Sequence, residues 1–257
     1  MPRAILAAPL VLAALVLAPA APPGGQSAGL PTVIAADVPL YPRDLVRNGV
    51  SGTIAVRARI ATDGQRVTTV EAADAPPALA GLTTANLKTW RFAPHVATTF
   101  DVVFRYAIVA RSCDSLGRDT RPIATLRFPT TVEVTAEIDP ICDGVFPPPP
   151  TFGVYITRAT VPFYPSRARD RGIEGVVRIG VSAKGVLTIV EGAEELGDPM
   201  ILAIRSWALS PPPFAEELDF TFRVIDGDCR NPGPTVIVGP QLTSFAVTAT
   251  RGVPCTP

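Results

Sequence analysis

Alternation of apolar and polar residues marks the strands of this chain. Residues 54–60 place apolar side chains at every second position, and residues 177–181 repeat the pattern. A period of two is typical of a strand with one buried face and one wet face. Asp63-Gly64 follows the first run, and Lys184-Gly185 follows the second. Because Gly freely adopts the positive φ of tight turns, we expect each run to begin a β-hairpin.

A helical period follows each hairpin. The apolar residues are spaced to fall on one side of a helix: Leu79, Leu82, Leu87 and Trp90 in the first place, then Met200, Ala203, Ile204 and Trp207 in the second. Asp198-Pro199 predicts the N-cap and the first residue of the second helix. Trp90 and Trp207 belong to these apolar sets, which favours a place in the core over ligand stacking.

The chain is a tandem repeat. Val38–Pro42 recurs as Val161–Pro165, and Gly49–Gly52 recurs as Gly172–Gly175, at the same offset of 123 residues. The later matches keep the same order: Trp90 with Trp207, residues 102–108 with 218–224, and residues 131–136 with 244–249. We therefore expect an α+β protein with two copies of one unit. Each copy is expected to be an antiparallel sheet packed with one or two helices, plus an extra β segment.

Four cysteines, Cys113, Cys142, Cys229 and Cys255, allow three disulfide pairings. Cys113 matches Cys229 and Cys142 matches Cys255 in the repeat, so each copy holds one equivalent pair. The pairing consistent with two independent copies is therefore Cys113–Cys142 and Cys229–Cys255. Each bond would close a loop of under thirty residues, which is worth roughly 3–4 kcal/mol by chain entropy.

The N-terminus has the form of a secretory signal. Met1–Arg3 is a short basic start, Ala4–Val16 is apolar, and Ala18–Ala20 supplies small residues for cleavage. The alternative is an uncleaved anchor, but an apolar run interrupted by Pro9 is shorter than the roughly 20 residues that span a membrane. We expect export to the periplasm, where disulfides form; anchoring in the inner membrane is the alternative.

These features predict five segments along the chain. They are a signal peptide at 1–20, a linker at 21–30, a first unit at 31–143, a Pro-rich linker at 144–150 and a second unit at 151–257. Pro147–Pro150 favours extended polyproline geometry, which acts as a semi-rigid spacer.

Composition and isolated motifs argue against nucleic-acid binding and catalysis. Lys plus Arg equals Asp plus Glu, at 23 each, so no field of one sign is available for a polyanion. His95 is the only histidine, and we expect a loop or surface role for it. The Gly-x-Ser-x-Gly run Gly25–Gly29 lies in the linker, without the strand and helix that a nucleophile elbow needs. We predict no enzyme activity, no cofactor, no metal and no small-molecule substrate.

Two groups of charged residues are expected to have no part in catalysis or binding. The adjacent carboxylates Glu194-Glu195 and Glu216-Glu217 are expected at the surface. The second group is a set of four arginines that we expect to guard an exposed sheet edge against aggregation: Arg57, Arg59, Arg105 and Arg111.

An ordered set of motifs resembles the C-terminal domain of TonB-family proteins. The first copy has Tyr41-Pro42, the Gly49–Gly52 pair, Asp63-Gly64 and Trp90–Pro94. The second copy keeps Tyr164-Pro165 and the Gly172–Gly175 pair, but its Asp-Gly becomes Lys184-Gly185, and Trp207–Pro211 is weaker. The resemblance covers about 70 residues of each copy and excludes the cysteine-bearing extensions.

The resemblance implies a periplasmic binding domain that pairs edge to edge with a peptide of an outer-membrane receptor, by strand addition. The matching candidate strands carry Val102, Phe104, Tyr106 and Ile108 in the first copy and Leu218, Phe220, Phe222 and Val224 in the second. We expect a non-catalytic protein that binds an envelope protein or peptide, with a cystine-bearing strand that caps this edge. The alternative is an anchored component of energy-coupled outer-membrane transport.

Overall fold

The computed structural model describes residues 30–47, 52–73, 75–110, 112–113, 122–138, 155–210, 216–227, 234–239 and 242–252. This part of the chain is a mixed α+β fold, mostly sheet with few helices, as the sequence predicts. The element order of the first repeat recurs in the second. The first repeat contains β1 (Val33–Ala35), α1 (Arg43–Arg47), β2 (Gly52–Thr62), β3 (Val67–Ala73), α2 (Pro77–Leu87), β4 (Arg91–Phe92), β5 (Thr99–Ala110), β6 (Ala124–Arg127) and β7 (Thr131–Ile138). The second contains β8 (Tyr155–Arg158), α3 (Ser166–Asp170), β9 (Gly175–Val181), β10 (Leu187–Glu191), α4 (Glu194–Ile204), β11 (Ala208–Ser210), β12 (Glu216–Gly227), β13 (Thr235–Val238) and β14 (Ser244–Gly252).

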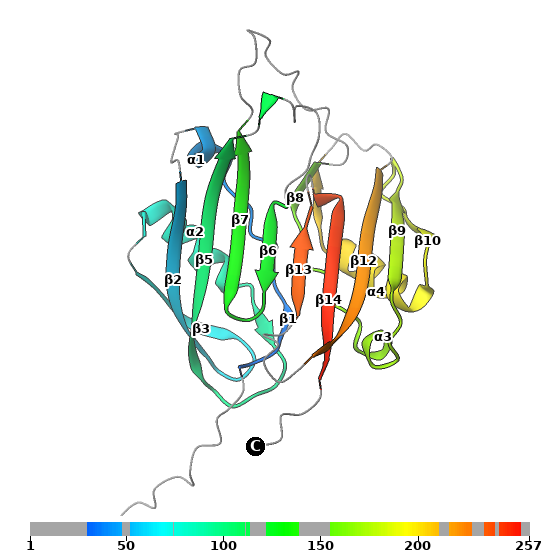
Figure 1. The fold of residues 1–257 in the computed structure, drawn as a ribbon, viewed down its shortest axis with the longest axis horizontal. Helices are drawn as coiled ribbons and strands as arrows, with labels where there is room; N and C mark the ends of the chain where they lie inside the picture. Colours follow the sequence, from blue (N-terminus) through cyan, green and yellow to red (C-terminus); the bar gives the residue numbers. More distant parts are fainter. Residues whose placement is uncertain are drawn as a thin grey trace, which may run out of the picture.

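Both repeats contribute to one ten-stranded sheet, in the order β10-β9-β12-β14-β13-β6-β7-β5-β2-β3 (Figure 1). The strands of the predicted antiparallel sheet, β3-β2-β5 in the first repeat and β10-β9-β12 in the second, pair antiparallel, and each extra segment adds a parallel pairing. β5 pairs in parallel with β7, and β12 pairs in parallel with β14. The reason is the path of the extra segment: β6 and β7 form an antiparallel pair, and it is the second of them that lies against β5.

The two repeats join through their extra segments. β6 and β13 run antiparallel, with Ala124 opposite Val238 and Arg127 opposite Thr235. Because these strands are equivalent in the two repeats, exchanging the repeats leaves the pairing unchanged. A second crossing has the same symmetry: the Val38 N–H donates to the Ala159 carbonyl, and the Val161 N–H donates to the Ala36 carbonyl, both at 2.8 Å. We call the β6–β13 pairing the junction.

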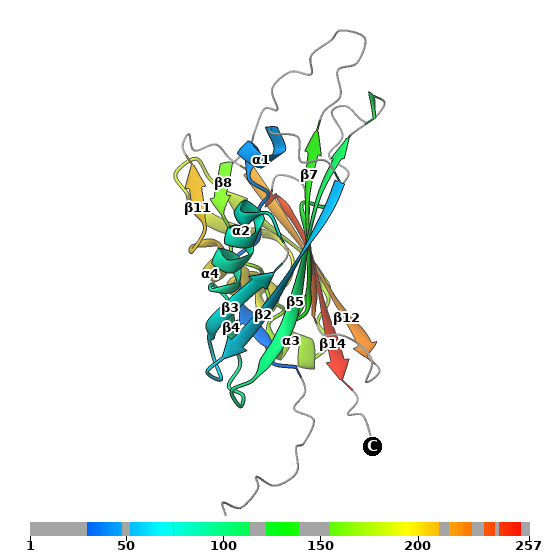
Figure 2. The same cartoon turned by 90° about the vertical axis from the view of Figure 1, so that its left-hand side faces the viewer.

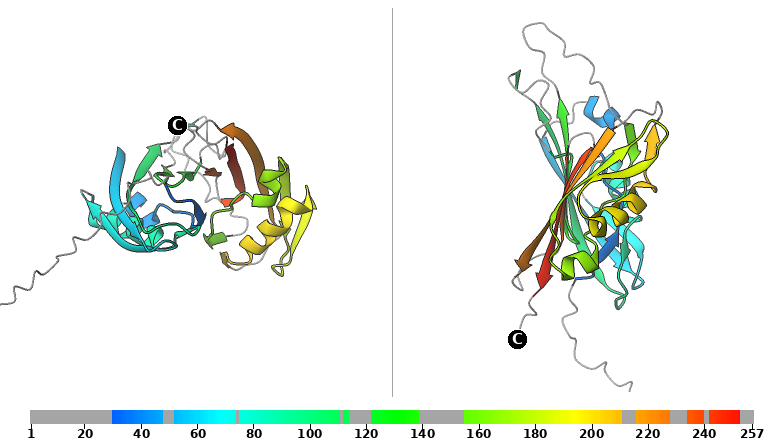
Figure 3. Two further views of the ribbon diagram at one scale, coloured as in Figure 1. Left: turned by 90° about the horizontal axis from the view of Figure 1, so that it is seen from below. Right: turned by 90° about the vertical axis from the view of Figure 1, so that its right-hand side faces the viewer.

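The helices all lie on one side of the sheet, which we call the covered face (Figure 2). Figure 3 shows that the helices of both repeats share this side. Two small sheets, β1-β4 and β8-β11, complete this layer. The core lies between the layers and contains Trp90, 0% exposed, and Trp207, 7% exposed. This confirms the prediction that both tryptophans are core residues.

The two hairpins follow the sequence pattern. Both helices form, but α2 ends at Leu87 and α4 at Ile204, so the predicted helical positions of Trp90 and Trp207 are wrong. β2 and β3 pair antiparallel, as do β9 and β10. α4 begins at Glu194 and contains Pro199 in its interior, so the predicted start at Asp198-Pro199 is wrong. Leu196 and Gly197 are buried in the extra turn, and a β-carbon on Gly197 would lie 2.5 Å from Ile189 Cδ1. Close packing on β10 thus extends the helix, although Pro199 cannot donate a backbone hydrogen bond.

Candidate functional site

The predicted peptide-pairing strands lie in the interior of the sheet. β5 is bonded to β2 on one side and to β7 on the other. β12 lies in the same way between β9 and β14. Six of the eight named side chains are buried in the core: Val102, Phe104, Tyr106, Leu218, Phe220 and Phe222. The other two, Ile108 and Val224, are half-buried. Neither strand therefore presents a free edge to a peptide along these residues.

The strands of the extra segments, β7 and β14, occupy the edges that the resemblance assigned to a receptor peptide. β7 pairs with β5 from Val103 to Ala110, and β14 pairs with β12 from Asp219 to Gly227. The expected capping of these edges by the extra segment agrees with this arrangement. Cys113 is disulfide-bonded, whereas Cys142, Cys229 and Cys255 lie outside the described residues. The disulfide pairing remains a prediction.

The outer strands of the ten-stranded sheet are β3 and β10. β3 has seven residues, and its pairing with β2 keeps one register from Arg57 opposite Ala73 to Ala61 opposite Thr69, then shifts between Ala61 and Thr62. β10 has five residues, and its register with β9 shifts between Ile189 and Glu191. Both outer strands therefore carry one irregularity, but β3 keeps the longer stretch in one register, and a longer regular stretch is the better template for another strand. The sequence could not identify β3 as an outer strand, because its place at the end of the sheet depends on the pairing of all the other strands.

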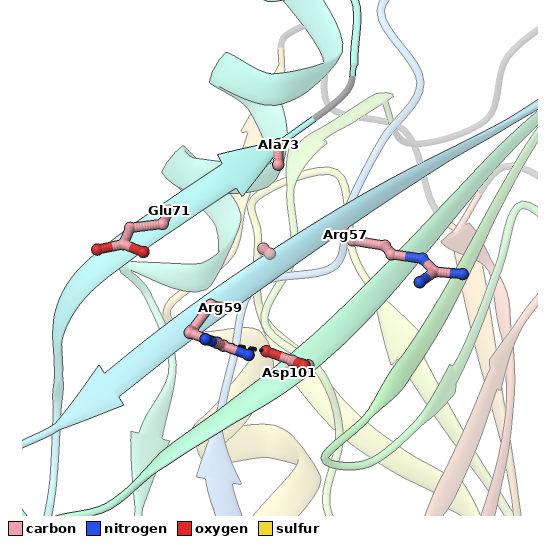
Figure 4. Close-up of a pocket in the computed structure, with 6 residues that line it drawn as sticks. Arg57, Arg59, Glu71, Ala73 and Asp101 are labelled. Carbon is pink, nitrogen blue, oxygen red and sulfur yellow. Dashed lines mark hydrogen bonds and ion pairs between the residues drawn. The ribbon is translucent and has the colours of Figure 1, made fainter.

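An open pocket of about 280 Å³ lies beside β3, on the face of the sheet that carries no helices (Figure 4). We call this side the open face. Arg57 and Arg59 of β2, Glu71 and Ala73 of β3, and Asp101 of β5 line the pocket. Figure 4 shows Arg59 directed toward Asp101, while Arg57 and Glu71 point away from each other. The pocket thus combines both charge signs beside an outer strand.

An ion pair between Arg59 and Asp101 lies in this pocket. The Arg59 Nε donates to Asp101 Oδ1 at 3.0 Å, and this hydrogen bond lowers the pKa of Asp101. Both side chains are more than 60% exposed, at 63% and 62%, so the pair adds little to stability. Arg57 and Glu71 make no ion pair within 4.0 Å among the described residues. Glu71 is therefore the charge on β3 itself that is available to a partner.

The interpretation of the arginines as edge guards is wrong for three of the four. Arg57 and Arg59 lie on β2, and Arg105 lies on β5; both strands have neighbours on each side. Their side chains instead cross the open face between strands, as in the contact of Arg105 Nη1 with Glu133 Oε1 at 3.6 Å. Arg111 lies outside the described residues.

Three of the four paired carboxylates are exposed, as predicted. Glu194 and Glu195 are exposed, and Glu195 contacts Arg171 at 3.4 Å. Glu217 is exposed and contacts Arg178 at 3.4 Å. Glu216 is half-buried.

His95 has hydrogen-bonding partners for both ring nitrogens. Nδ1 lies 2.9 Å from the Ala93 carbonyl, and Nε2 lies 2.8 Å from Thr62 Oγ1. A carbonyl only accepts, so Nδ1 carries the proton in the neutral ring and Nε2 accepts from the Thr62 hydroxyl. The ring also packs edge-on against Phe92, with ring centres 5.5 Å apart. These contacts tie the loop before β5 to the end of β2.

Within the described residues, no group of three or more His, Cys, Asp or Glu side chains is placed to hold a metal ion. No helix in the same part of the chain is long and apolar enough to cross a membrane. Comparison of the chain with protein-family models, with curated proteins and with solved structures found no match.

Proposed function

We propose that this chain is an exported, non-catalytic binding protein of the cell envelope that recruits an extended segment of a partner protein to the free edge of β3. In this proposal the two repeats are TonB C-terminal-like domains, each closed by its own disulfide. The observation that carries the proposal is the position of β3. It is a seven-residue strand at the end of the sheet, and its residues 69–73 keep one register with β2.

Strand addition at β3 gives both affinity and selectivity. Main-chain groups on the outer side of β3 supply the hydrogen bonds, and alternate side chains of the added strand fall on the open face. Those side chains lie beside Thr69, Glu71 and Ala73, which share a face because they alternate along the strand. The Glu71 carboxylate favours a Lys or Arg in the partner at this place.

Pairing at the interior strands requires an additional step. A receptor peptide reaches β5 only after β7 has left it, and this exposes the parallel ladder from Val103 to Ala110. The same holds for β12 and β14. The edge of β3 requires no such displacement, which is why we favour it.

Site-specific photocrosslinking in the cell envelope tests this proposal. A benzoylphenylalanine at Thr69, an exposed residue of β3, is expected to form a covalent adduct with the partner protein. The same probe at Ile237, an exposed residue of β13 that is paired with β14 on one side and β6 on the other, is the matched control. Glu71→Lys in the Thr69 probe protein is expected to abolish the adduct, and Glu191→Lys on β10 to leave it. Equal adducts from Ile237, or an adduct unaffected by Glu71→Lys, would refute the proposal.

Export is tested separately, by sequencing the N-terminus of the mature protein. A start at Ala21 agrees with removal of the signal peptide. A chain that keeps Met1–Ala20 would favour the alternative, an anchored component of energy-coupled transport.

A further inference from the structure

A groove of about 360 Å³ lies between the two repeats on the covered face. It is lined by Leu82, Ala85 and Asn86 of α2 and by the segment from Asp37 to Leu40 in the first repeat, and by Thr157 and Arg158 of β8 in the second. We call it the inter-repeat groove. Its volume falls in the range of roughly 300–1,000 Å³ that is usual for ligand sites. Because the β3 pocket lies on the open face, the two sites are separate.

The polar groups of the groove are held in fixed positions. Asn86 Oδ1 accepts a hydrogen bond from Trp90 Nε1 at 3.1 Å, and Asn86 Nδ2 donates to the Asp37 carbonyl at 2.9 Å. An amide nitrogen carries two protons, so one N–H of Asn86 remains for another acceptor. The amide is thus oriented by its neighbours, as a binding group should be.

Arg158 supplies further donors at the mouth of the groove. Its Nε and Nη2 donate to the Asp37 carboxylate at 2.8 and 3.3 Å. The Arg158 side chain is 62% exposed and the Asp37 side chain 17%, so the guanidinium faces solvent and the carboxylate lies behind it. A guanidinium has five N–H donors, and the remaining ones are accessible from the mouth.

These groups select a neutral ligand that accepts hydrogen bonds. Since Asp37 neutralises Arg158, the pair offers directed N–H donors without a net charge that would favour an anion. Leu40 and Leu82 are half-buried, and Pro39 is buried, so the wall between the donors is apolar. An aliphatic side chain flanked by peptide carbonyls matches both requirements.

The second repeat provides an internal comparison. Its equivalents of Asp37 and Asn86 are Thr160 and Ala203, and the equivalent of Arg158 in the first repeat is Ala35. Ala85, whose small side chain leaves the groove open, corresponds to Leu202, which is 66% exposed. The equivalent place in the other half thus lacks the ion pair, the amide and the small residue. The ion pair, the amide and the small residue are therefore found together in the inter-repeat groove and not at the equivalent place in the other half.

We propose that the inter-repeat groove binds a neutral peptide segment, with an aliphatic side chain against Leu40 and Leu82 and a main-chain carbonyl on Asn86 and Arg158. This binding goes beyond strand addition at β3, and it uses the two repeats together. It needs no change in the sheet.

Nuclear magnetic resonance with N-acetyl-leucine methylamide as the probe tests the groove in the mature chain. The Trp90 indole N–H donates to Asn86, so its resonance is expected to shift in a saturable way. The Trp207 indole donates to Thr160 instead and is expected to stay in place. A Trp90 resonance that does not move up to the solubility limit of the probe would overturn the proposal.

Two variants taken from the internal comparison sharpen the test. Ala85→Leu, which places the residue of the other repeat in the groove, is expected to weaken binding at least about tenfold. The matched control Leu202→Ala is expected to leave the affinity within about twofold. Both sites are exposed on helices, so folding is expected to survive, and an unchanged Trp207 resonance checks this. Equal binding by Ala85→Leu and the unmodified chain would refute the groove as the site.

The charge of the ligand is tested with N-acetyl-leucine, which carries a carboxylate. The methylamide is expected to bind at least as tightly. A carboxylate probe that bound about tenfold more tightly would contradict the neutral ligand. None of these outcomes depends on β3, since Thr69 and Glu71 are unchanged in every variant.

Discussion

At Gly64, the turn between β2 and β3 leaves no room for a side chain. Its φ is +100°, and a β-carbon there would lie 2.5 Å from the His95 carbonyl oxygen. The His95 N–H also donates to the Gly64 carbonyl at 3.1 Å. The turn glycine and the histidine loop are therefore packed backbone to backbone.

Gly64→Ala is expected to destabilise the fold by about 3 kcal/mol, because it combines an unfavourable φ with a backbone clash. The matched control is Gly185→Ala in the second hairpin, where φ is +74° and nothing lies within 4 Å of a β-carbon. That change is expected to cost only about 1 kcal/mol. Urea unfolding of both variants measures the difference. Equal costs would contradict the assigned contact.

Tyr106 gives the protein an alkaline sensitivity. Burial raises the pKa of this phenol from 10.0 to about 12, although its hydrogen bond with Thr83 acts in the opposite direction. Between these two values the unfolded chain loses the proton while the folded chain keeps it, so stability falls as pH rises. Below pH 10 both states are protonated, and Tyr106 adds no pH dependence.

Tyr106→Phe is therefore expected to lose less stability than the unmodified protein between about pH 10 and pH 12. At pH 8 the variant is expected to be less stable by about 1 kcal/mol, because the buried Thr83 hydroxyl loses its partner. Guanidinium unfolding at pH 8 and pH 11 checks both statements. Identical alkaline losses in the two proteins would assign the sensitivity to other groups.

Among the elements, the four-residue strands of the junction unite the two halves. Their inward side chains Leu126, Val236 and Val238 are each 0% exposed. Ile237, the next residue on β13, faces the other side and is 40% exposed. One strand thus offers neighbouring positions of opposite burial.

Val236→Asp is expected to destabilise the protein by about 4 kcal/mol or more, because it places an unpaired charge in the core. Ile237→Asp, one residue away on the open face, is expected to cost about 1 kcal/mol. Thermal unfolding of the two variants compares them. A larger loss at Ile237 than at Val236 would mean that the register of the junction is different.

The sequence predicts elements better than it predicts their partners. Alternation located β2, β5 and β12, and Asp63-Gly64 located the first turn, because these signals act over a few neighbouring residues. The predicted start of α4 was wrong because the packing of Gly197 against β10 outweighs the preference of Pro199 for the first position of a helix. Local pattern has no information on a tertiary contact of this kind.

The candidate sites depend still more on tertiary structure. β3 became an edge only once nine other strands were placed in the sheet. The inter-repeat groove combines Asp37, Asn86 and Arg158, which are far apart in the chain. The four residues of β6 and the four of β13 carry no signal that they pair with each other rather than with a third strand.

For the whole molecule, one continuous sheet and core predict a single cooperative transition. Each repeat contains one tryptophan, Trp90 or Trp207. In Trp207→Phe the remaining fluorescence reports on the first repeat, and in Trp90→Phe it reports on the second. Within each variant, the fluorescence transition is expected to coincide with the loss of secondary structure measured by circular dichroism. A separation of the two curves would show that the halves unfold one at a time.

The junction has a further consequence, since both of its strands belong to one polypeptide. Two separate subunits held together mainly by a pair of four-residue strands would dissociate on dilution. A covalent tether keeps the second half at an effective concentration on the order of millimolar, whatever the amount of protein present. The ten-stranded sheet therefore stays assembled at very low protein concentration as well as in a concentrated sample.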